Sequence, residues 1–454
     1  MKSTASSPYM GVLILGATAL FGNAVFTAMV LLMLVSCIWT PRRALPLLFM
    51  SGPLKLTAVG TILPIDITLL LMAAVVLIFL YLVVFNKIKT TPYKFSILVL
   101  IVVLSVIVVF SLWWTIAPWG YISKSGINIL FIYLPLVFIL VLGLHDNSPL
   151  FSPPVFIDTV VPVAVSWVGM GLYNQIHDLH PKQFNNPNDI VHHMSGFGED
   201  YHFFTIFCIF AFLQYFIWIL CEKQSLQSLA AGFLLFVLAY GMLNSPARVL
   251  TIGLLFVVAI TLYKFPKKLS GLAIASIVLI TAVALTGVTW YLSNLTATQM
   301  GSLQRVTNFD FSGESVFSRF VAVKVALRTY TQDIWHILFG VGVDGVAAAN
   351  QDSGLYAHNL LLELLLEYGL LLCLPFVLLF VLSVKRGWAC FLEAIQYKQA
   401  AWIWLTGLYM IFFIFSLSSN TLGNMRFYWI LVGISFSMPS FSQFFISSEL
   451  KTAK

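Results

Sequence analysis

The feature that most constrains this chain is a series of apolar runs, each close to the length of one membrane crossing, that recurs along it. Stretches such as 65–85, 95–114, 155–172 and 427–445 contain almost no charged residues. The whole chain is 60% hydrophobic and only 9% charged, whereas soluble domains carry roughly 25% charged residues. Because about 20 apolar residues suffice for a helix to cross a bilayer, the sequence predicts an all-α, polytopic membrane protein with roughly 12–14 transmembrane helices.

Loop lengths divide the expected bundle into two parts. The expected inner loops are short, and two expected outer loops are long. One outer loop, at 173–202, is rich in histidine, and a larger one covers 293–356. We therefore expect an N-terminal bundle at 1–228, a core at 229–447 that contains the large loop, and no soluble domain.

Two segments have more specific expectations. Residues 10–39 form an apolar stretch interrupted by Gly22-Asn23, which predicts either a tight hairpin of two short spans or one long tilted helix. Residues 358–382 are apolar apart from Glu363 and Glu367, and they are expected to form one continuous span that returns the chain to the inner side.

Lysine and arginine are distributed differently over this topology. The net charge of +7 is attributed to inner-side lysines by the positive-inside rule rather than to nucleic-acid binding. Most lysines follow that rule, but five of the eight arginines are expected on the outer side: Arg248, Arg305, Arg319, Arg328 and Arg426. Arginine binds phosphate through two parallel hydrogen bonds and stays charged. These residues therefore indicate a phosphorylated ligand at the outer face, unless they extend to the interface or pair with loop acids.

Arg248 is the most distinctive of these arginines. It lies in a short turn just before a returning helix, and no acidic residue lies within 20 positions of it in the sequence. Arg319 and Arg328 fall in 315–331, which has the pattern of an amphipathic helix at the membrane surface. Such a helix either positions Arg319 over a site or only rests its basic residues on lipid headgroups.

His358 is the candidate acid–base residue. It is expected at the start of a span on the outer side, where an imidazole can accept a proton from a hydroxyl near neutral pH. Phosphate-binding arginines beside one imidazole suit an attack of a hydroxyl on a carbon that carries a lipid-linked diphosphate, with the arginines stabilising the departing charge. The alternative is a histidine that only caps the helix. Gly340 and Gly342 indicate a tight turn but not a phosphate loop, because no Gly-Lys-Ser/Thr follows.

No metal site is expected. The histidines of 173–202 have spacings that fit no strong zinc pattern, and nearby acids are scattered. The five cysteines show no CxxC spacing and are interpreted as small packing residues.

The order of these motifs resembles the bacterial O-antigen polymerase/ligase superfamily. The resemblance rests on Arg248 in a tight loop, Ser318-Arg319 in a large outer loop, Gly340-Val-Gly, and the signature that runs from His358-Asn359 to Glu367-x-Gly369. It covers 229–382 by motif. It implies a GT-C-like helical fold and metal-independent, cofactor-free transfer of a glycan from undecaprenyl diphosphate at the periplasmic face of the inner membrane.

By motif position, the resemblance gives Arg248 and Arg319 the diphosphate-binding roles and His358 the role of activating the acceptor. Arg305 is the rival of Arg319, and Arg328 and Asn359 are further candidates for substrate binding. In a polymerase the acceptor is another lipid-linked glycan, and in a ligase it is lipid A-core. We favour the polymerase, for which a chain-length regulator is a candidate partner.

A transporter or flippase for lipid-linked sugars is the alternative from another class of protein. It should carry ionisable residues along a path through the middle of the membrane. The clear spans here are nearly uncharged, which argues against it.

Overall fold

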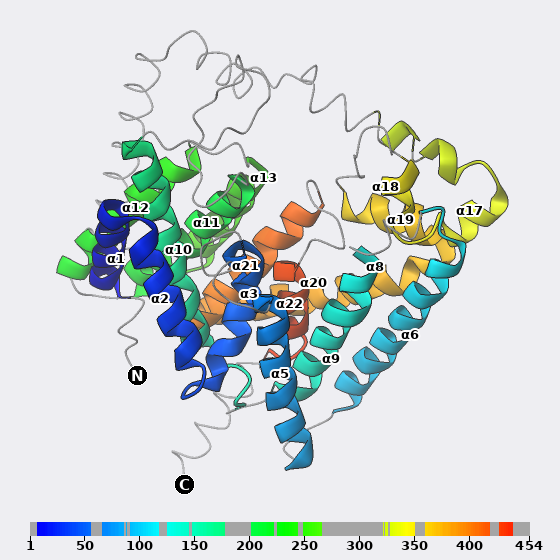
Figure 1. The fold of residues 1–454 in the computed structure, drawn as a ribbon, viewed down its shortest axis with the longest axis horizontal. Helices are drawn as coiled ribbons and strands as arrows, with labels where there is room; N and C mark the ends of the chain where they lie inside the picture. Colours follow the sequence, from blue (N-terminus) through cyan, green and yellow to red (C-terminus); the bar gives the residue numbers. More distant parts are fainter. Residues whose placement is uncertain are drawn as a thin grey trace.

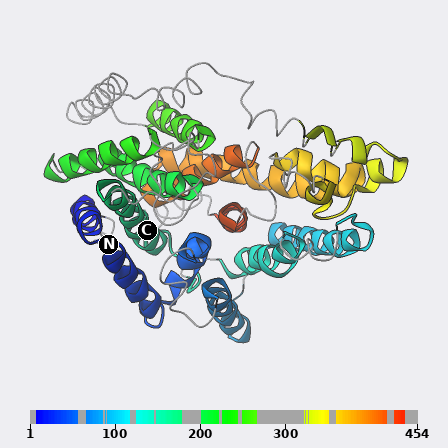
Figure 2. The same cartoon turned by 45° about the horizontal axis from the view of Figure 1, so that its top comes forward.

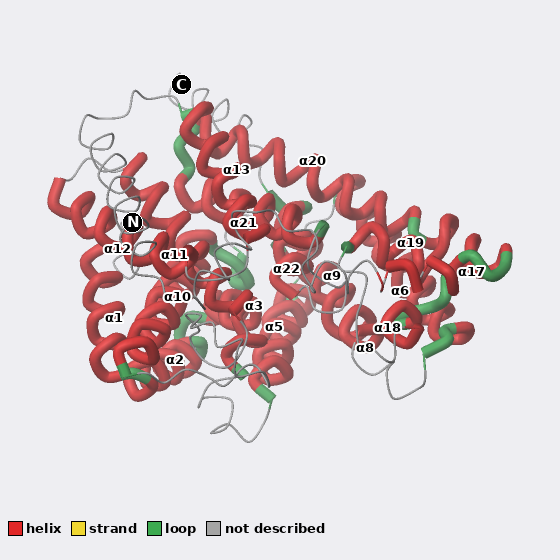
Figure 3. The backbone as a smooth tube through the Cα atoms, turned by 90° about the horizontal axis from the view of Figure 1, so that it is seen from above, coloured by secondary structure: helices red, strands yellow, loops and turns green. Residues whose placement is uncertain are grey.

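The computed structural model describes residues 7–55, 66–85, 88, 91–117, 125–144, 148–177, 201–221, 225–243, 248–265, 321–349 without 322 and 326, 359–417 and 426–438. Within these ranges every regular element is helical (Figure 3). Six helices are long and apolar enough to cross a membrane, and five shorter ones are also apolar, counting only the described residues. The predicted class of all-α polytopic membrane protein is therefore confirmed.

The described helices follow one another along the chain as Figure 1 labels them. The first half contains α1 (Pro8–Phe21), α2 (Asn23–Ser36), η1 (Pro41–Arg43), α3 (Ala44–Leu54), α5 (Ile67–Val84), α6 (Pro92–Trp114), α8 (Ser125–Asn128), η2 (Ile129–Tyr133), α9 (Leu134–Gly143), α10 (Pro153–Ile176) and α11 (Tyr201–Cys221). The second half contains α12 (Ser225–Leu243), α13 (Arg248–Lys264), α17 (Ile334–Phe339), α18 (Gly345–Ala349), α19 (Leu360–Leu372), α20 (Leu374–Gln396), α21 (Ala400–Ser416) and α22 (Arg426–Ser435).

Helix α22 lies near the centre of the bundle and is almost fully enclosed. All of its residues from Phe427 to Ser435 are buried, and it packs against α3, α9, α20 and α21. Figure 2 shows it in red, viewed nearly end-on, with helices from both halves of the chain around it. Because α22 contacts four other helices and is covered on every side, it links helices from both halves of the chain.

The two ends of the bundle can be distinguished by the contacts of α21 and α22. At one end, the Asn359 amide before α19 donates to the carbonyl of Leu417, directly after α21, at 2.6 Å. At the other end, the ring of Tyr93 at the start of α6 lies 6.3 Å from that of Phe436, directly after α22. We name these the Asn359 end and the Lys94 end. Helix α22 begins with Arg426 at the Asn359 end.

Two sequence expectations are resolved by glycines with positive φ. Gly22 has φ of 61° and separates α1 from α2, so residues 10–39 form two short helices and not one long helix. The expectation of one continuous span over 358–382 is wrong. Gly369 has φ of 67°, which interrupts the helical backbone, and Pro375 supports a new start for α20. Helix α20 then continues to Gln396, beyond the expected boundary at 382.

Candidate functional site

The segment Gly340–Gly345 lies between the end of α6 and α19. Val341 donates its backbone N–H to Leu366 at 2.9 Å, and Gly342 donates to the carbonyl of Glu367 at 3.0 Å. On its other side the segment receives a hydrogen bond at the carbonyl of Val343 from the Thr115 hydroxyl, at 2.7 Å. The segment is therefore a joint that fixes α19 to α6.

The glycines of this joint are required by geometry. Gly340 and Gly342 have φ of 78° and 82°, which L side chains rarely adopt. A Cβ on Gly340 would lie 2.2 Å from the carbonyl oxygen of Glu367, and one on Gly342 would lie 2.3 Å from Thr115 Cα. The expectation of a tight turn is confirmed, and the close approach of three backbone segments explains both glycines.

The start of α18 binds a carboxyl group that belongs to the chain itself. The Glu367 carboxyl oxygens accept hydrogen bonds from the backbone N–H of Asp344 and of Val346. Burial raises the pKa of Glu367 well above its ordinary value, and the nearby Glu363 and Asp344 raise it further. The contacts of Glu367 with Asp344 and Val346 therefore hold the joint to α19.

A small apolar cluster completes this platform, which consists of 327–330, α17, α18 and α19. Tyr330, Val341, Val346 and Leu366 form its core, and the Tyr330 hydroxyl donates to the carbonyl of Ile337 at 2.8 Å. Figures 1 and 3 show α17, α18 and α19 together at one side of the molecule, beside the end of α6. The helix expected at 315–331 is observed over the residues of that range that the structure describes, and Tyr330 anchors it.

Asn359 fixes the beginning of α19 in two ways. Its side-chain oxygen accepts from the backbone N–H of Leu362 at 3.0 Å, which caps the helix. Its amide nitrogen donates to Leu417 at 2.6 Å, so the start of α19 is tied to the end of α21. The amide oxygen and nitrogen of Asn359, the residue after His358, therefore both fix the position of the start of α19.

Arg248 begins α13 at the same end of the bundle. A Cβ added at Gly253 would lie 3.3 Å from Ile411, and one added at Gly407 would lie 3.0 Å from Val257. Residue 253 of α13 thus faces residue 411 of α21, and residue 257 faces residue 407. Because the residue number in α21 falls as that in α13 rises, the two helices are antiparallel. The same register places the backbone of Arg248 level with Ser416, the last residue of α21 and one residue before the partner of Asn359.

The other predicted site residues are placed only in part. Arg328 is exposed on the helical segment that ends with Tyr330. Arg305, Arg319 and His358 lie outside the described residues, as does the side chain of Arg248. The structure thus places the backbone of Arg248 and the start of α19 at the same end of the bundle, each beside the end of α21. Neither a comparison with protein-family models nor a comparison with curated proteins finds a match.

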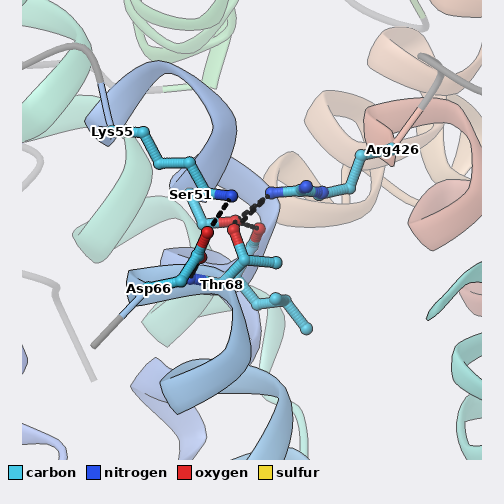
Figure 4. A network of polar contacts seen from close by, with 6 residues as sticks. Ser51, Lys55, Asp66, Thr68 and Arg426 are labelled. Atoms are coloured by element: carbon cyan, nitrogen blue, oxygen red, sulfur yellow. Dashed lines mark hydrogen bonds and ion pairs between the residues drawn. The ribbon is translucent and has the colours of Figure 1, made fainter. Parts of the chain in front are cut away.

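Arg426 was counted among the outer arginines but was not assigned to the site. Its guanidinium reaches across the bundle to α3 and α5, where Nη1 donates to the hydroxyls of Ser51 and Thr68 (Figure 4). The Ser51 and Thr68 side chains are buried. The signal in the sequence was a pair of hydroxyl residues, Ser51 and Thr68, in otherwise apolar segments. Such residues could have been recognised as partners for a buried arginine.

An ion pair lies next to Arg426. Lys55 and Asp66 are 2.5 Å apart, and Asp66 also caps α5 by accepting from the backbone N–H of Thr68 at 2.7 Å. Burial alone would raise the pKa of Asp66, but the hydrogen bonds from Lys55 and Thr68 and the charge of Lys55 outweigh it and lower that pKa. The carboxylate is therefore ionised at neutral pH and neutralises Lys55.

Cations at the Lys94 end have a different environment. Lys94 donates to the carbonyl of Leu144, directly after α9, at 2.8 Å, and Arg386 donates to that of Met438, just after α22, at 2.5 Å. Carbonyls at the end of a helix carry partial negative charge. These cations are therefore compensated by the backbone, whereas Arg248 and Arg426 each begin a helix, where the partial charge is positive.

Proposed function

We propose that the protein is a membrane glycosyltransferase that transfers a glycan from undecaprenyl diphosphate to a hydroxyl of another lipid-linked repeat, as an O-antigen or surface-polysaccharide polymerase does. The observation that carries this proposal is the gathering of three helix starts at the Asn359 end, namely those of α13, α19 and α22. Two of them begin with an arginine, and the third follows His358 in the sequence.

The chemistry follows from these residue types. Arginines at helix starts favour an anion both by their own charge and by the positive end of the helix dipole. A diphosphate held there would leave with its developing charge stabilised, while His358 accepts the proton of the attacking hydroxyl. The glycan carbon exchanges its bond to the diphosphate oxygen for one to the acceptor oxygen, and no metal takes part. The proposed location is the periplasmic side of the inner membrane.

The distribution of charge within the spans supports an enzyme over a transporter. In the six candidate spans that the structure describes, the charged residues are few, namely Lys94, Asp158, Lys385, Arg386 and Glu393. Lys94 and Arg386 contact the backbone at the Lys94 end. A carrier of lipid-linked sugars would need ionisable groups along its path through the midplane.

The test is a pair of substitutions in cells, Arg248→Ala and His358→Ala, with Arg386→Ala as the control at the opposite end. We expect both site variants to reach the membrane at the level of the unsubstituted protein and to lose long polysaccharide chains, while the control keeps them. Normal chains in either site variant would reject the assigned role.

A gel of lipopolysaccharide from a deletion strain separates the polymerase from the ligase. A single repeat attached to the core indicates a lost polymerase. Unmodified core together with retained lipid-linked polymer indicates a lost ligase instead.

A further inference from the structure

Arg426 is held by neutral groups from three different parts of the chain. Nη1 bonds to the hydroxyls of Ser51 in α3 and of Thr68 in α5, and the guanidinium also hydrogen-bonds the Tyr133 hydroxyl at the end of η2. The Ser51 hydroxyl in turn donates to the carbonyl of Leu48 at 2.8 Å, so its lone pairs face the arginine. These three hydroxyls therefore fix the position of the guanidinium, but no described carboxylate neutralises it.

The neighbouring charges do not change this balance. Asp66 is the acid nearest to the network in Figure 4, and it is already paired with Lys55. The sum over Arg426, Lys55 and Asp66 is one positive charge. A cation that is taken out of water without a counterion is costly. The backbone of Arg426 begins α22, but its guanidinium lies at Ser51 and Gly52 in the last turn of α3, where the partial negative charge of the helix end compensates only part of the positive charge.

Arg386 provides the comparison within the same molecule. Both arginines are half-buried, and in both the Nε atom has no hydrogen-bond partner among the described residues. They differ in what they contact. Arg386 donates to a carbonyl just past the end of α22, which suits a cation, whereas the partners of Arg426 among the described residues are the hydroxyls of Ser51, Thr68 and Tyr133. A structural role therefore accounts for Arg386, but these neutral partners do not balance the full charge of Arg426.

We propose that Arg426, positioned by Ser51 and Thr68, binds a phosphate group of a membrane lipid at the Asn359 end of the bundle. Phosphate supplies the missing negative charge, and its oxygens match the planar guanidinium fork. The helices around the start of α22 are apolar, and such surroundings suit a lipid more than a soluble anion. The proposal rests on the proposed function only for the identity of that lipid, which would be the lipid-linked diphosphate.

The test uses the unsubstituted full-length protein in nanodiscs of phosphatidylcholine, so it does not depend on a variant folding. Phenylglyoxal modifies free guanidinium groups, and mass spectrometry of the digested protein quantifies modification at Arg426 and, as the internal control, at Arg386. The probes are farnesyl diphosphate, phosphatidylglycerol added to the nanodisc, and inorganic pyrophosphate.

With the probe at about ten times its dissociation constant, the site is unoccupied roughly a tenth of the time, so we expect a lipid phosphate to reduce modification at Arg426 about tenfold and to leave Arg386 unchanged. Protection by farnesyl diphosphate alone identifies the diphosphate lipid, and equal protection by phosphatidylglycerol identifies ordinary phospholipid. Protection by pyrophosphate but by neither lipid, equal protection of both arginines, or no protection would overturn the proposal.

Binding of farnesyl diphosphate by Arg426→Gln and Arg426→Lys adds a second measurement. We expect the glutamine variant to lose affinity about tenfold or more, and the lysine variant to lose less because it keeps the charge but not the fork. Arg386→Gln should bind as the unsubstituted protein does. If the Arg426 variants lose binding of farnesyl diphosphate but Arg248→Ala and His358→Ala make normal polysaccharide, the proposed function is refuted and the lipid site stands. If the Arg426 variants bind normally but Arg248→Ala and His358→Ala lose polysaccharide, only the lipid site is refuted.

Discussion

Substitution of Gly340 by alanine should loosen the platform from the bundle. The new Cβ would lie 2.2 Å from the carbonyl oxygen of Glu367 and 2.5 Å from the Tyr368 nitrogen. Both are backbone atoms of α19, which cannot turn away as a flexible side chain can. The backbone of the substituted residue must also remain at φ of 78° or break the contacts on either side of it.

The expected cost can be estimated from these contacts. A non-glycine residue in the left-handed region costs roughly 1–2 kcal/mol. Relief of the overlap separates the segment from α19 and removes two hydrogen bonds, Val341 to Leu366 and Gly342 to Glu367, each contributing roughly 0.5–1.5 kcal/mol. The sum is about 2–5 kcal/mol, so local opening of the platform should become at least about 30-fold more frequent. The platform has its own small core, so the effect should stay local.

Hydrogen exchange followed by mass spectrometry measures this opening directly. Peptides from 334–349 and 360–372 should exchange faster in Gly340→Ala, while those from α10 and α11 should not change. The matched control is Gly232→Ala in α12, because a Cβ there meets nothing within 4 Å and alanine favours a helix. If Gly340→Ala exchanges no faster than the control across 334–349, the role assigned to this glycine is wrong.

Two further variants test the same region. Asn359→Ala removes both the cap of α19 and its bond to Leu417. It should lower the free energy of unfolding by about 1–3 kcal/mol, seen as a lower midpoint in thermal unfolding. Asn359→Ser keeps a capping oxygen without the amide donor and should lose less, and equal losses would contradict the dual role. The raised pKa of Glu367 means that the folded protein binds that proton more tightly than the unfolded chain, so stability should be greatest below the ordinary value of 4.5 and fall as pH rises from there towards the raised pKa. Glu367→Gln should flatten this dependence, and an unchanged slope would reject the assignment.

The class of fold could be predicted because hydropathy alone determines which segments can enter a bilayer. The helix boundaries near polar residues were also predictable. Arg248 was expected just before a returning helix and is the first residue of α13, and Asn359 caps α19 one residue after the expected start of that span. These features depend on local chemistry, namely the apolar length of a segment and the hydrogen-bonding capacity of the residue before it.

The break at Gly369 could not be predicted in the same way. An isolated glycine in an apolar run is compatible with a continuous helix, at a small cost in stability. Here the backbone turns because Leu338 approaches so closely that a Cβ on Gly369 would lie 2.4 Å from its carbonyl group. That contact joins residues 31 positions apart, so the break is a consequence of tertiary packing. The same is true of Glu367, whose partners lie more than 20 residues before it.

The orientation of helices also refines what an outward arginine indicates. Membrane topology assigns a charge to one side but does not say whether it meets the beginning or the end of a helix. At the Lys94 end, Lys94 and Arg386 lie against carbonyls that follow helix ends, and the backbone stabilises both. The backbones of Arg248 and Arg426 instead begin helices, and the partners of the Arg426 guanidinium among the described residues are neutral hydroxyls. In the proposed topology the Asn359 end faces outward, where the positive-inside rule also disfavours cations. Under that proposal these two arginines argue for an anionic ligand more strongly than the number of outer arginines does.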